Sequence, residues 1–262
     1  MANQKRPGLD GHETSLCSHI FRLLRKNRVP WLVFENVEGL IHWHRVGSRE
    51  DRPPAIAYVC DELEKLGYSW AHRVVKLQGF GIPQRRTRVF IVASIHSDPR
   101  DIILSTDECL GQCIAMYNRE CYNCFNTPPH HQRIKWSGFD LGESRNPPLL
   151  DEVYTFRTTN TANTCVMKHE NNSGKIFGLS IEDAEKLMGL PVDWTNPHGT
   201  NIPTNLRFKF LGLAVAVPQS EWIGERLFKP HDLKFTRDEQ GTPFDVKNMG
   251  YESAWPPAAW NI

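Results

Sequence analysis

The chain has 262 residues, of which 40% are hydrophobic and 23% are charged, and its formal net charge is +1. This composition is typical of a globular protein with one large domain or two smaller ones. It excludes a protein that is basic overall, so a contact with nucleic acid has to come from a local patch of cations. No apolar run is long enough to cross a membrane, and the N-terminus lacks the apolar stretch of a secretion signal. We therefore expect a soluble intracellular protein with reduced cysteines.

The first part of the chain alternates predicted helices and strands. An amphipathic helix is predicted over residues 12–26, where apolar residues recur at helical spacing: Leu16, Ile20, Leu23 and Leu24. Residues 31–34 (Trp-Leu-Val-Phe) form a short apolar run that is typical of a strand buried on both faces. A second helix is predicted over 54–66, because it begins at a proline and ends at Gly67. This alternation favours an α/β sheet.

Residues 74–94 contain two β-branched runs on either side of a Gly/Pro break, and they are predicted to form a pair of strands. The connection is cationic, with the sequence Gln-Arg-Arg-Thr-Arg over residues 84–88. Alternate residues of an extended segment share a face, so Gln84, Arg86 and Arg88 are expected to point the same way. Guanidinium groups suit phosphate oxygens and base edges. The alternative interpretation is a solvated basic turn.

Glu35 directly follows the first predicted strand. In open α/β sheets the chemistry lies beyond the carboxyl ends of the strands, which makes this carboxylate a candidate catalytic group. The alternative is a solvated glutamate or one that caps a helix.

Residues 98–178 lose clear periodicity, and we expect a separate small domain of irregular or β character there. Four of the seven cysteines lie in it with the spacing C-x3-C-x7-C-x2-C: Cys109, Cys113, Cys121 and Cys124. Four thiolates this close together could close a tetrahedral zinc site. The alternative is four unconnected thiols in a loop-rich insert.

Helical patterns return towards the C-terminus. A helix is predicted over residues 180–188, where Ser180 and Asp183 have the spacing of a capping box. Helical character resumes over 205–227, and the tail after Pro230 contains aromatic residues between prolines. Whether the tail packs on the body of the protein is left open by the sequence.

Four short blocks, in this order along the chain, resemble those of the cytosine-5 DNA methyltransferase family. They are residues 34–37 (Phe-Glu-Asn-Val), 81–90 (Gly-Ile-Pro-Gln-Arg-Arg-Thr-Arg-Val-Phe), 187–191 (Leu-Met-Gly-Leu-Pro) and 211–215 (Leu-Gly-Leu-Ala-Val). A variable insert separates the second block from the third. The resemblance implies transfer of a methyl group from S-adenosylmethionine to C5 of a cytosine that has been flipped out of duplex DNA.

The resemblance also implies roles for single residues. Glu35 matches the carboxyl group that donates a proton to N3 of the ring, and Arg86 and Arg88 match the arginines that hold the flipped base. Gln84 and Thr164 match positions near the DNA, Thr164 as a contact to the backbone. The cofactor is expected to touch four consecutive residues of the last block: Gly212, Leu213, Ala214 and Val215. Most of the family has Asn where this chain has Leu213, which weakens the cofactor inference.

The expected fold is the C-terminal part of a Rossmann-like, S-adenosylmethionine-dependent methyltransferase sheet. Residues 1–97 would form part of the catalytic domain, 98–178 the target-recognition insert, 179–228 the return to the catalytic domain, and 229–262 a C-terminal tail. By this resemblance the Gly-rich cofactor loop and the Pro-Cys nucleophile of the family are missing, and we expect the chain to start at an internal Met.

We therefore expect a truncated or split chain that is inactive alone and works on double-stranded DNA with an N-terminal methyltransferase half or a complete enzyme. Two alternatives stay open: a non-catalytic DNA-binding or regulatory relative, and a tRNA cytosine-5 methyltransferase. The expected location is the nucleus in a eukaryote and otherwise the cytoplasm.

Overall fold

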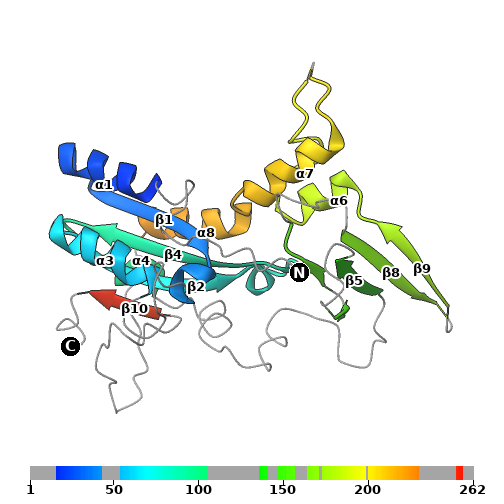
Figure 1. Cartoon of the computed structure of the whole chain (residues 1–262), viewed down its shortest axis with the longest axis horizontal. Coiled ribbons are helices and arrows are strands. Elements are labelled where there is room, and N and C mark those ends of the chain that lie inside the picture. The colour runs from blue at the N-terminus through cyan, green and yellow to red at the C-terminus, as the bar shows by residue number, and fades with distance from the viewer. Residues whose placement is uncertain are drawn as a thin grey trace, which may run out of the picture. The chain divides into compact units, whose positions relative to one another are not determined.

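The computed structural model of the chain describes residues 16–42, 54–104, 136–140, 147–150, 152–156, 164–170, 173–198, 200–229 and 252–255 (Figure 1). The chain divides into two compact units. Unit 1 comprises Met1–Val75, Thr87–Asp107 and Arg226–Ile262, and unit 2 comprises Lys76–Arg86 and Glu108–Glu225.

A four-stranded sheet lies at the centre of unit 1. In spatial order its strands are β1 (Trp31–Val37), β4 (Thr87–Ser94), β2 (Ser69–Lys76) and β10 (Glu252–Trp255). β1 runs antiparallel to β4, and β10 runs antiparallel to β2. The predicted pairing of the two β-branched runs is therefore confirmed, since they form the neighbouring strands β2 and β4. Part of the tail, whose placement the sequence left open, adds the strand β10.

Three helices of unit 1 share one hydrophobic core with the sheet: α1 (Leu16–Lys26), α2 (Gly39–His42) and α3 (Ala55–Lys65) (Figure 1). The helix predicted over 54–66 is confirmed, because α3 follows Pro54 and Gly67 adopts a positive φ of 81°. For α1 the predicted apolar face was partly wrong, because Leu23 is 57% exposed. The buried stripe is instead Cys17, Phe21 and Leu24, which recur at i, i+4 and i+7.

The first strand differs from its predicted burial. Of residues 31–34 only Phe34 is buried, and Val33 is 38% exposed. The reason is position, because β1 is an outer strand of the sheet as the structure describes it. Continuous buried runs belong to the two inner strands, since β4 is buried from Arg88 to Ser94 and β2 from Trp70 to Val75.

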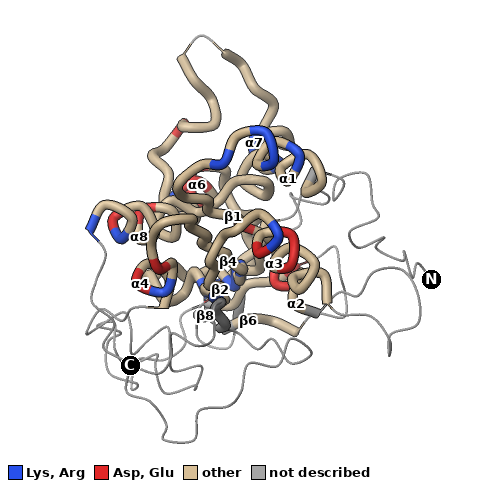
Figure 2. The backbone as a smooth tube through the Cα atoms, turned by 90° about the vertical axis from the view of Figure 1, so that its left-hand side faces the viewer, with Lys and Arg blue, Asp and Glu red and all other residues tan. Residues whose placement is uncertain are grey.

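Charge also links two helices of unit 1. Figure 2 shows basic residues on α1 and acidic residues on α3. Arg25 of α1 forms an ion pair with Glu62 of α3, and Lys65 holds Asp61 one turn away at 2.6 Å. The Lys65–Asp61 pair is exposed and adds little stability, whereas Glu62 is buried where it meets the half-exposed Arg25. The two helices also share the apolar core of unit 1.

Unit 2 contains an antiparallel sheet and a short parallel pair. In spatial order the sheet consists of β6 (Leu149–Leu150), β5 (Trp136–Asp140), β8 (Thr164–Glu170) and β9 (Ser173–Gly178). β3 (Gln84–Arg85) runs parallel to β7 (Val153–Tyr154). The β character predicted for residues 98–178 is confirmed for β5 to β9, whereas the start of that range forms the short helix α4 (Arg100–Ile103) of unit 1.

Helices α6 (Ile181–Lys186), α7 (Thr204–Leu213) and α8 (Val217–Phe228) follow the sheet of unit 2 in the chain. The predicted cap is confirmed, since the Ser180 side chain accepts a hydrogen bond from the Asp183 amide at 3.1 Å. After α6, Gly189 adopts a φ of 76°, and the Val217 amide donates to the Met188 carbonyl at 2.9 Å. The end of α6 and the start of α8 are thus in direct contact.

The boundaries of the two compact units differ from the domain boundaries predicted from the sequence. Residues 179–225, which the sequence analysis returns to the catalytic domain, lie in unit 2 together with the predicted insert, and so do residues 76–86. No helix in the described ranges is long and apolar enough to cross a membrane.

Candidate active site

Glu35 and Arg88 form an ion pair on neighbouring strands of unit 1. In the antiparallel register Glu35 lies opposite Phe90 and Arg88 lies opposite Val37, which makes Glu35 and Arg88 diagonal neighbours on one face. Arg88 Nε lies 2.9 Å from Glu35 Oε1. Glu35 lies inside β1, so the expectation that it follows the strand was wrong. The pairing of its strand with an antiparallel neighbour also differs from a sheet whose carboxyl ends share one edge.

The two partners of this pair differ in exposure. The Glu35 side chain is 24% exposed and that of Arg88 is 10% exposed. Burial lowers the pKa of Arg88, and the adjacent Glu35 carboxylate opposes that change. The Arg88 guanidinium also donates from Nη1 to the Thr87 carbonyl at 2.8 Å. Arg88 is thus a fixed cation, and the carboxylate it orients remains partly accessible.

Gln84 and Arg86 lie in unit 2, and both side chains are buried. The alternative interpretation of a solvated basic turn therefore does not hold for these two residues. Gln84 is 0% exposed, and its Nε2 donates to the Leu187 carbonyl at 3.4 Å. Arg86 is 1% exposed, and its Nη2 donates to the Ala214 carbonyl. Arg85 between them is exposed, so burial alternates along this segment as it does in extended backbone. Whether Arg88 of unit 1 points the same way as Gln84 and Arg86 stays a prediction. The burial of Gln84 favours a structural role for it over a contact with DNA.

The segment expected to touch the cofactor lies at the end of α7. Gly212 and Leu213 are its last two residues, and the Ala214 amide closes the helix by donating to Phe210 at 2.9 Å. Leu213 is 65% exposed. The exposed Leu213 side chain is therefore next in the chain to Ala214, whose carbonyl is held by the buried Arg86 guanidinium.

Among the other predicted site residues, the structure describes Thr164. Thr164 is the first residue of β8, is 7% exposed, and accepts a hydrogen bond at its carbonyl from the Leu179 amide at 3.1 Å. The four cysteines predicted to bind zinc, Cys109, Cys113, Cys121 and Cys124, lie outside the described residues, so zinc stays a prediction. Elsewhere in the described ranges, no group of three or more His, Cys, Asp or Glu residues could hold a metal ion.

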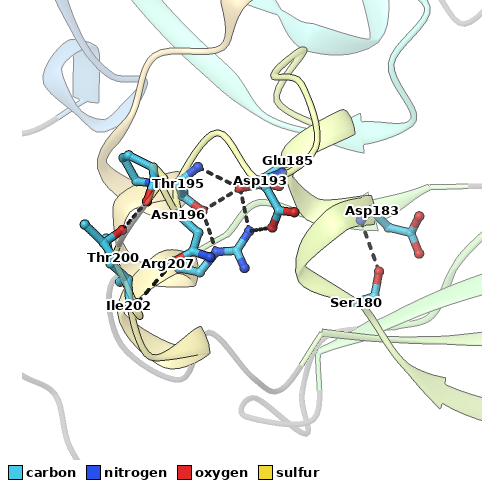
Figure 3. Close-up of polar contacts among 10 residues, drawn as sticks. Ser180, Asp183, Glu185, Asp193, Thr195, Asn196, Thr200, Ile202 and Arg207 are labelled. Atoms are coloured by element: carbon cyan, nitrogen blue, oxygen red, sulfur yellow. Dashed lines mark hydrogen bonds and ion pairs between the residues drawn. The ribbon is translucent and has the colours of Figure 1, made fainter.

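One buried polar cluster was missed by the sequence analysis. Glu185 of α6 is 0% exposed and accepts hydrogen bonds from the amides of Asp193 (2.7 Å) and Thr195 (2.8 Å), as Figure 3 shows. Its Oε1 also accepts from Thr195 Oγ1 at 2.5 Å and lies 2.9 Å from Arg207 Nη2. Arg207 further reaches Asp193 Oδ1 at 3.1 Å and Thr195 Oγ1 at 2.8 Å.

The charge state of this cluster follows from its contacts. Burial alone would raise the pKa of Glu185, but the hydrogen bonds from Thr195, Arg207 and Asp193 lower it on balance. For Arg207, burial acts to lower the pKa and the two carboxylates raise it. The pair is therefore ionised, and it fixes the chain that leaves α6. The sequence signal for it is weak, a Glu that lies four residues before the Gly-Leu-Pro of residues 189–191.

The fold is that of a methyltransferase. The crystal structure of the Schizosaccharomyces pombe Dnmt2 methyltransferase aligns with a TM-score of 0.55 at 14% identity, covering 88% of this chain and 74% of that one. The predicted class, an α/β sheet of the S-adenosylmethionine-dependent methyltransferases with a small β insert, is thereby confirmed.

The sequence comparisons narrow this class to a family. Residues 3–112 match the family of C-5 cytosine-specific DNA methylases. The type II methyltransferase M2.BsuMI of Bacillus subtilis (strain 168) is 31% identical over 97% of this chain and 61% of its own length. The type II methyltransferase M.MspI of Moraxella sp. is 26% identical over 85% of this chain and 52% of its own length. The chain is therefore similar to the C-5 cytosine-specific DNA methylases, with the family match over residues 3–112, and it spans about half to three fifths of the length of these relatives.

Proposed function

We propose that this chain forms part of a DNA cytosine-5 methyltransferase that moves a methyl group from S-adenosylmethionine to C5 of cytosine. The observation that carries the proposal is the Glu35–Arg88 pair at 2.9 Å. Both residues lie inside the segment that matches the family, and both match its catalytic blocks. The Glu35 carboxylate is oriented by the buried Arg88 guanidinium and is still partly exposed, which supports a catalytic role for it.

The proposed chemistry follows from the electronic structure of cytosine. C5 is a poor nucleophile until a thiolate adds at C6 and negative charge develops on the ring. Glu35 would hold a proton at N3, where that charge builds up, and general acid catalysis of this kind contributes roughly 10²- to 10⁴-fold in rate. Arg88 would fix the direction of the carboxyl group and place positive charge beside O2 of the base.

The cofactor would lie against residues 212–215. S-adenosylmethionine, when bound, supplies the methyl group in electrophilic form. The residues present fit such a group in part, because the exposed Leu213 side chain offers apolar surface and Arg86 fixes the Ala214 carbonyl. Leu213 stands where an amide side chain would offer a hydrogen bond, so the fit relies on apolar contact.

We also propose that the nucleophilic thiol and the Gly-rich cofactor loop come from outside these residues, in a methyltransferase half or a complete enzyme that acts with this chain on duplex DNA. None of the seven cysteines follows a proline. Three of them, Cys17, Cys60 and Cys165, are buried, and burial raises the pKa of each thiol. Neutral buried thiols are poor nucleophiles, which supports an outside source.

Methyl transfer from labelled S-adenosylmethionine to duplex DNA tests the proposal. The full chain is assayed alone and with a cytosine-5 methyltransferase fragment that supplies the Pro-Cys and Gly-rich blocks. We expect transfer only in the mixture, and a loss of roughly 10²- to 10⁴-fold for Glu35→Gln. Glu38→Gln, on the same stretch of chain, serves as the matched control and should leave transfer unchanged. Equal transfer by the Glu35→Gln and native chains would refute the role of Glu35.

The second candidate function is a non-catalytic DNA-binding or regulatory relative. The exposed Leu213 in place of Asn and the buried thiols favour it. Binding of duplex DNA that survives Glu35→Gln, without methyl transfer in the mixture, would support this candidate. A third arm with tRNA in place of duplex DNA separates a tRNA methyltransferase from both. The relatives M2.BsuMI and M.MspI are bacterial, so they lend no support to a nuclear location.

A further inference from the structure

Trp194 is held outward by the buried cluster around Glu185. The residues on both sides of it, Asp193 and Thr195, donate their backbone amides to the Glu185 carboxylate (Figure 3). The Trp194 amide closes a turn on the Pro191 carbonyl at 3.2 Å, and Asp193 adopts a positive φ of 65°. Trp194 itself is 63% exposed. An aromatic side chain on a fixed backbone loses little freedom on binding, which is what an interface anchor requires.

The charge around Trp194 indicates what kind of partner it fits. Residues 187–206 contain no Lys or Arg, and their single acidic residue is Asp193. The Asp193 side chain is 62% exposed. Nucleic acid binding depends on cations that neutralise phosphates, and this segment offers none. It suits a protein surface that has an apolar hollow with cations at its edge.

Unit 2 contains such a hollow. A groove of about 470 Å³ lies between the β3–β7 pair, β8 and α6. Apolar side chains line it: Ile82, Pro83, Val153, Val166, Leu179 and Leu187. Ligand sites in proteins occupy roughly 300–1,000 Å³, so the groove has room for an indole ring and a neighbouring aliphatic side chain.

The groove also carries the required cations. Lys168 of β8 and Lys186 of α6 both border it, and both are exposed. Asp183 lies beside them, 3.7 Å from the Lys186 ammonium. The charged residues that line the groove are two lysines and one aspartate, which leaves an excess of positive charge. At the Trp194 turn the carboxylates of Asp193 and Glu185 share the single cation of Arg207, which leaves an excess of negative charge.

We propose that Trp194 of one copy of this chain inserts into the groove of a second copy, where Asp193 meets Lys168 and Lys186. The turn and the groove both belong to unit 2, so each copy offers one of each. A pair in which each copy gives and receives one tryptophan satisfies both contacts at once and closes as a dimer. This proposal does not depend on the methyltransferase function.

Sedimentation velocity of the full chain over the micromolar range tests it. We expect concentration-dependent dimers, and Trp194→Ala should weaken them by about thirtyfold or more, as for the loss of an interface anchor. Phe228→Ala is the matched control, because Phe228 is 89% exposed and lies in neither the turn nor the groove. A native chain that stays monomeric, or a Trp194→Ala chain that dimerises like the native one, would overturn the proposal.

A mixing experiment separates this contact from a general loss of structure. Val166→Glu puts a charge into the groove and keeps the turn, whereas Trp194→Ala keeps the groove and removes the ring. Each variant alone should be monomeric, and an equal mixture should associate through the one intact contact. Lys168→Glu, at an exposed position, serves as a milder groove variant and should weaken dimers of the native type. A mixture that stays monomeric would contradict the proposed contact between Trp194 and the groove. Dissociation of the dimers by short duplex DNA that binds the groove would contradict it as well.

Discussion

Two Glu–Arg pairs, one in each unit, have the same shortest separation and different surroundings. Glu35 and Arg88 lie 2.9 Å apart, and so do Glu185 and Arg207. Glu185 is completely buried and also accepts hydrogen bonds from Asp193 and Thr195, whereas Glu35 is 24% exposed. The distance within an ion pair therefore does not reveal its role.

The difference lies in what each carboxylate organises. The cost of burying Glu185 is offset by several donors, which is the condition under which a buried ion pair is stable. Two of those donors are the backbone amides of Asp193 and Thr195, so the pair fixes the path of the chain. Glu35 keeps an accessible surface and one oriented cation, which suits a group that acts on a substrate.

The largest effect is expected when the buried pair is broken. Arg207→Ala leaves the Glu185 charge in the interior without its cation, and such losses cost about 3–5 kcal/mol. Urea unfolding should show this fall in the free energy of unfolding. Lys186→Ala, at an exposed neighbouring position, is the control and should change it by less than about 0.5 kcal/mol. A small effect of Arg207→Ala would remove the distinction between the two pairs.

A smaller effect is expected from Thr195→Val, which keeps the shape of the side chain and removes its hydroxyl. That hydroxyl donates to Glu185 and accepts from Arg207 Nε at 2.8 Å. Hydrogen bonds to charged groups contribute about 1.5–3 kcal/mol, and we expect a loss in that range in urea unfolding. Thr200→Val is the comparison, because its hydroxyl bonds only the exposed Pro197 carbonyl among the contacts described here. Equal losses for the two variants would argue against a special role for the cluster.

The pH dependence of stability should also separate the pairs. The pKa of Glu185 in the folded chain lies below that of an unfolded glutamate, which is about 4.3. Its stabilising contribution is therefore complete above that value and is lost as the pH falls through the folded-state pKa. Urea midpoints measured from neutral pH to about pH 3 should fall less steeply for Glu185→Gln than for the native chain. Parallel curves would show that Glu185 does not contribute.

The smallest effect on folding is expected at the candidate active site. Glu35→Gln retains a hydrogen-bond acceptor for Arg88, and a partly exposed pair contributes about 1 kcal/mol or less. The melting temperature should therefore change little while methyl transfer in the complemented assay falls. A loss of stability as large as that of Arg207→Ala would show that Glu35 is structural.

Local patterns allowed much of the fold to be predicted. The helix α3 and the cap at Ser180 were correct, because apolar spacing, proline, glycine and capping residues act within a few residues of chain. The burial of β1 was wrong because it depends on which strands flank it, and strand order is a long-range property. Leu23 was misplaced because a shift of one residue turns a helix by about 100°.

The candidate site was predicted less completely. The family blocks led to Glu35 and Arg88, but the depth at which Gln84 and Arg86 are buried was not predicted. Their burial depends on contacts with Leu187 and Ala214, which lie 103 and 128 residues further along the chain. Glu185 and Arg207 were missed because each looks like an ordinary charged residue on a helix. They form a pair because the chain folds back and brings two residues that are 22 positions apart into contact. No short sequence pattern predicts such a contact.

Gly189 has a consequence for tolerance to mutation. Its backbone has a positive φ, and a Cβ atom placed on it would lie 2.6 Å from Cδ of Pro218. Any replacement therefore meets two obstacles at once, a disfavoured backbone conformation and the first turn of α8. In a saturation scan of this chain, position 189 should tolerate no substitution well, even though glycines elsewhere, such as Gly224, have open space beside them.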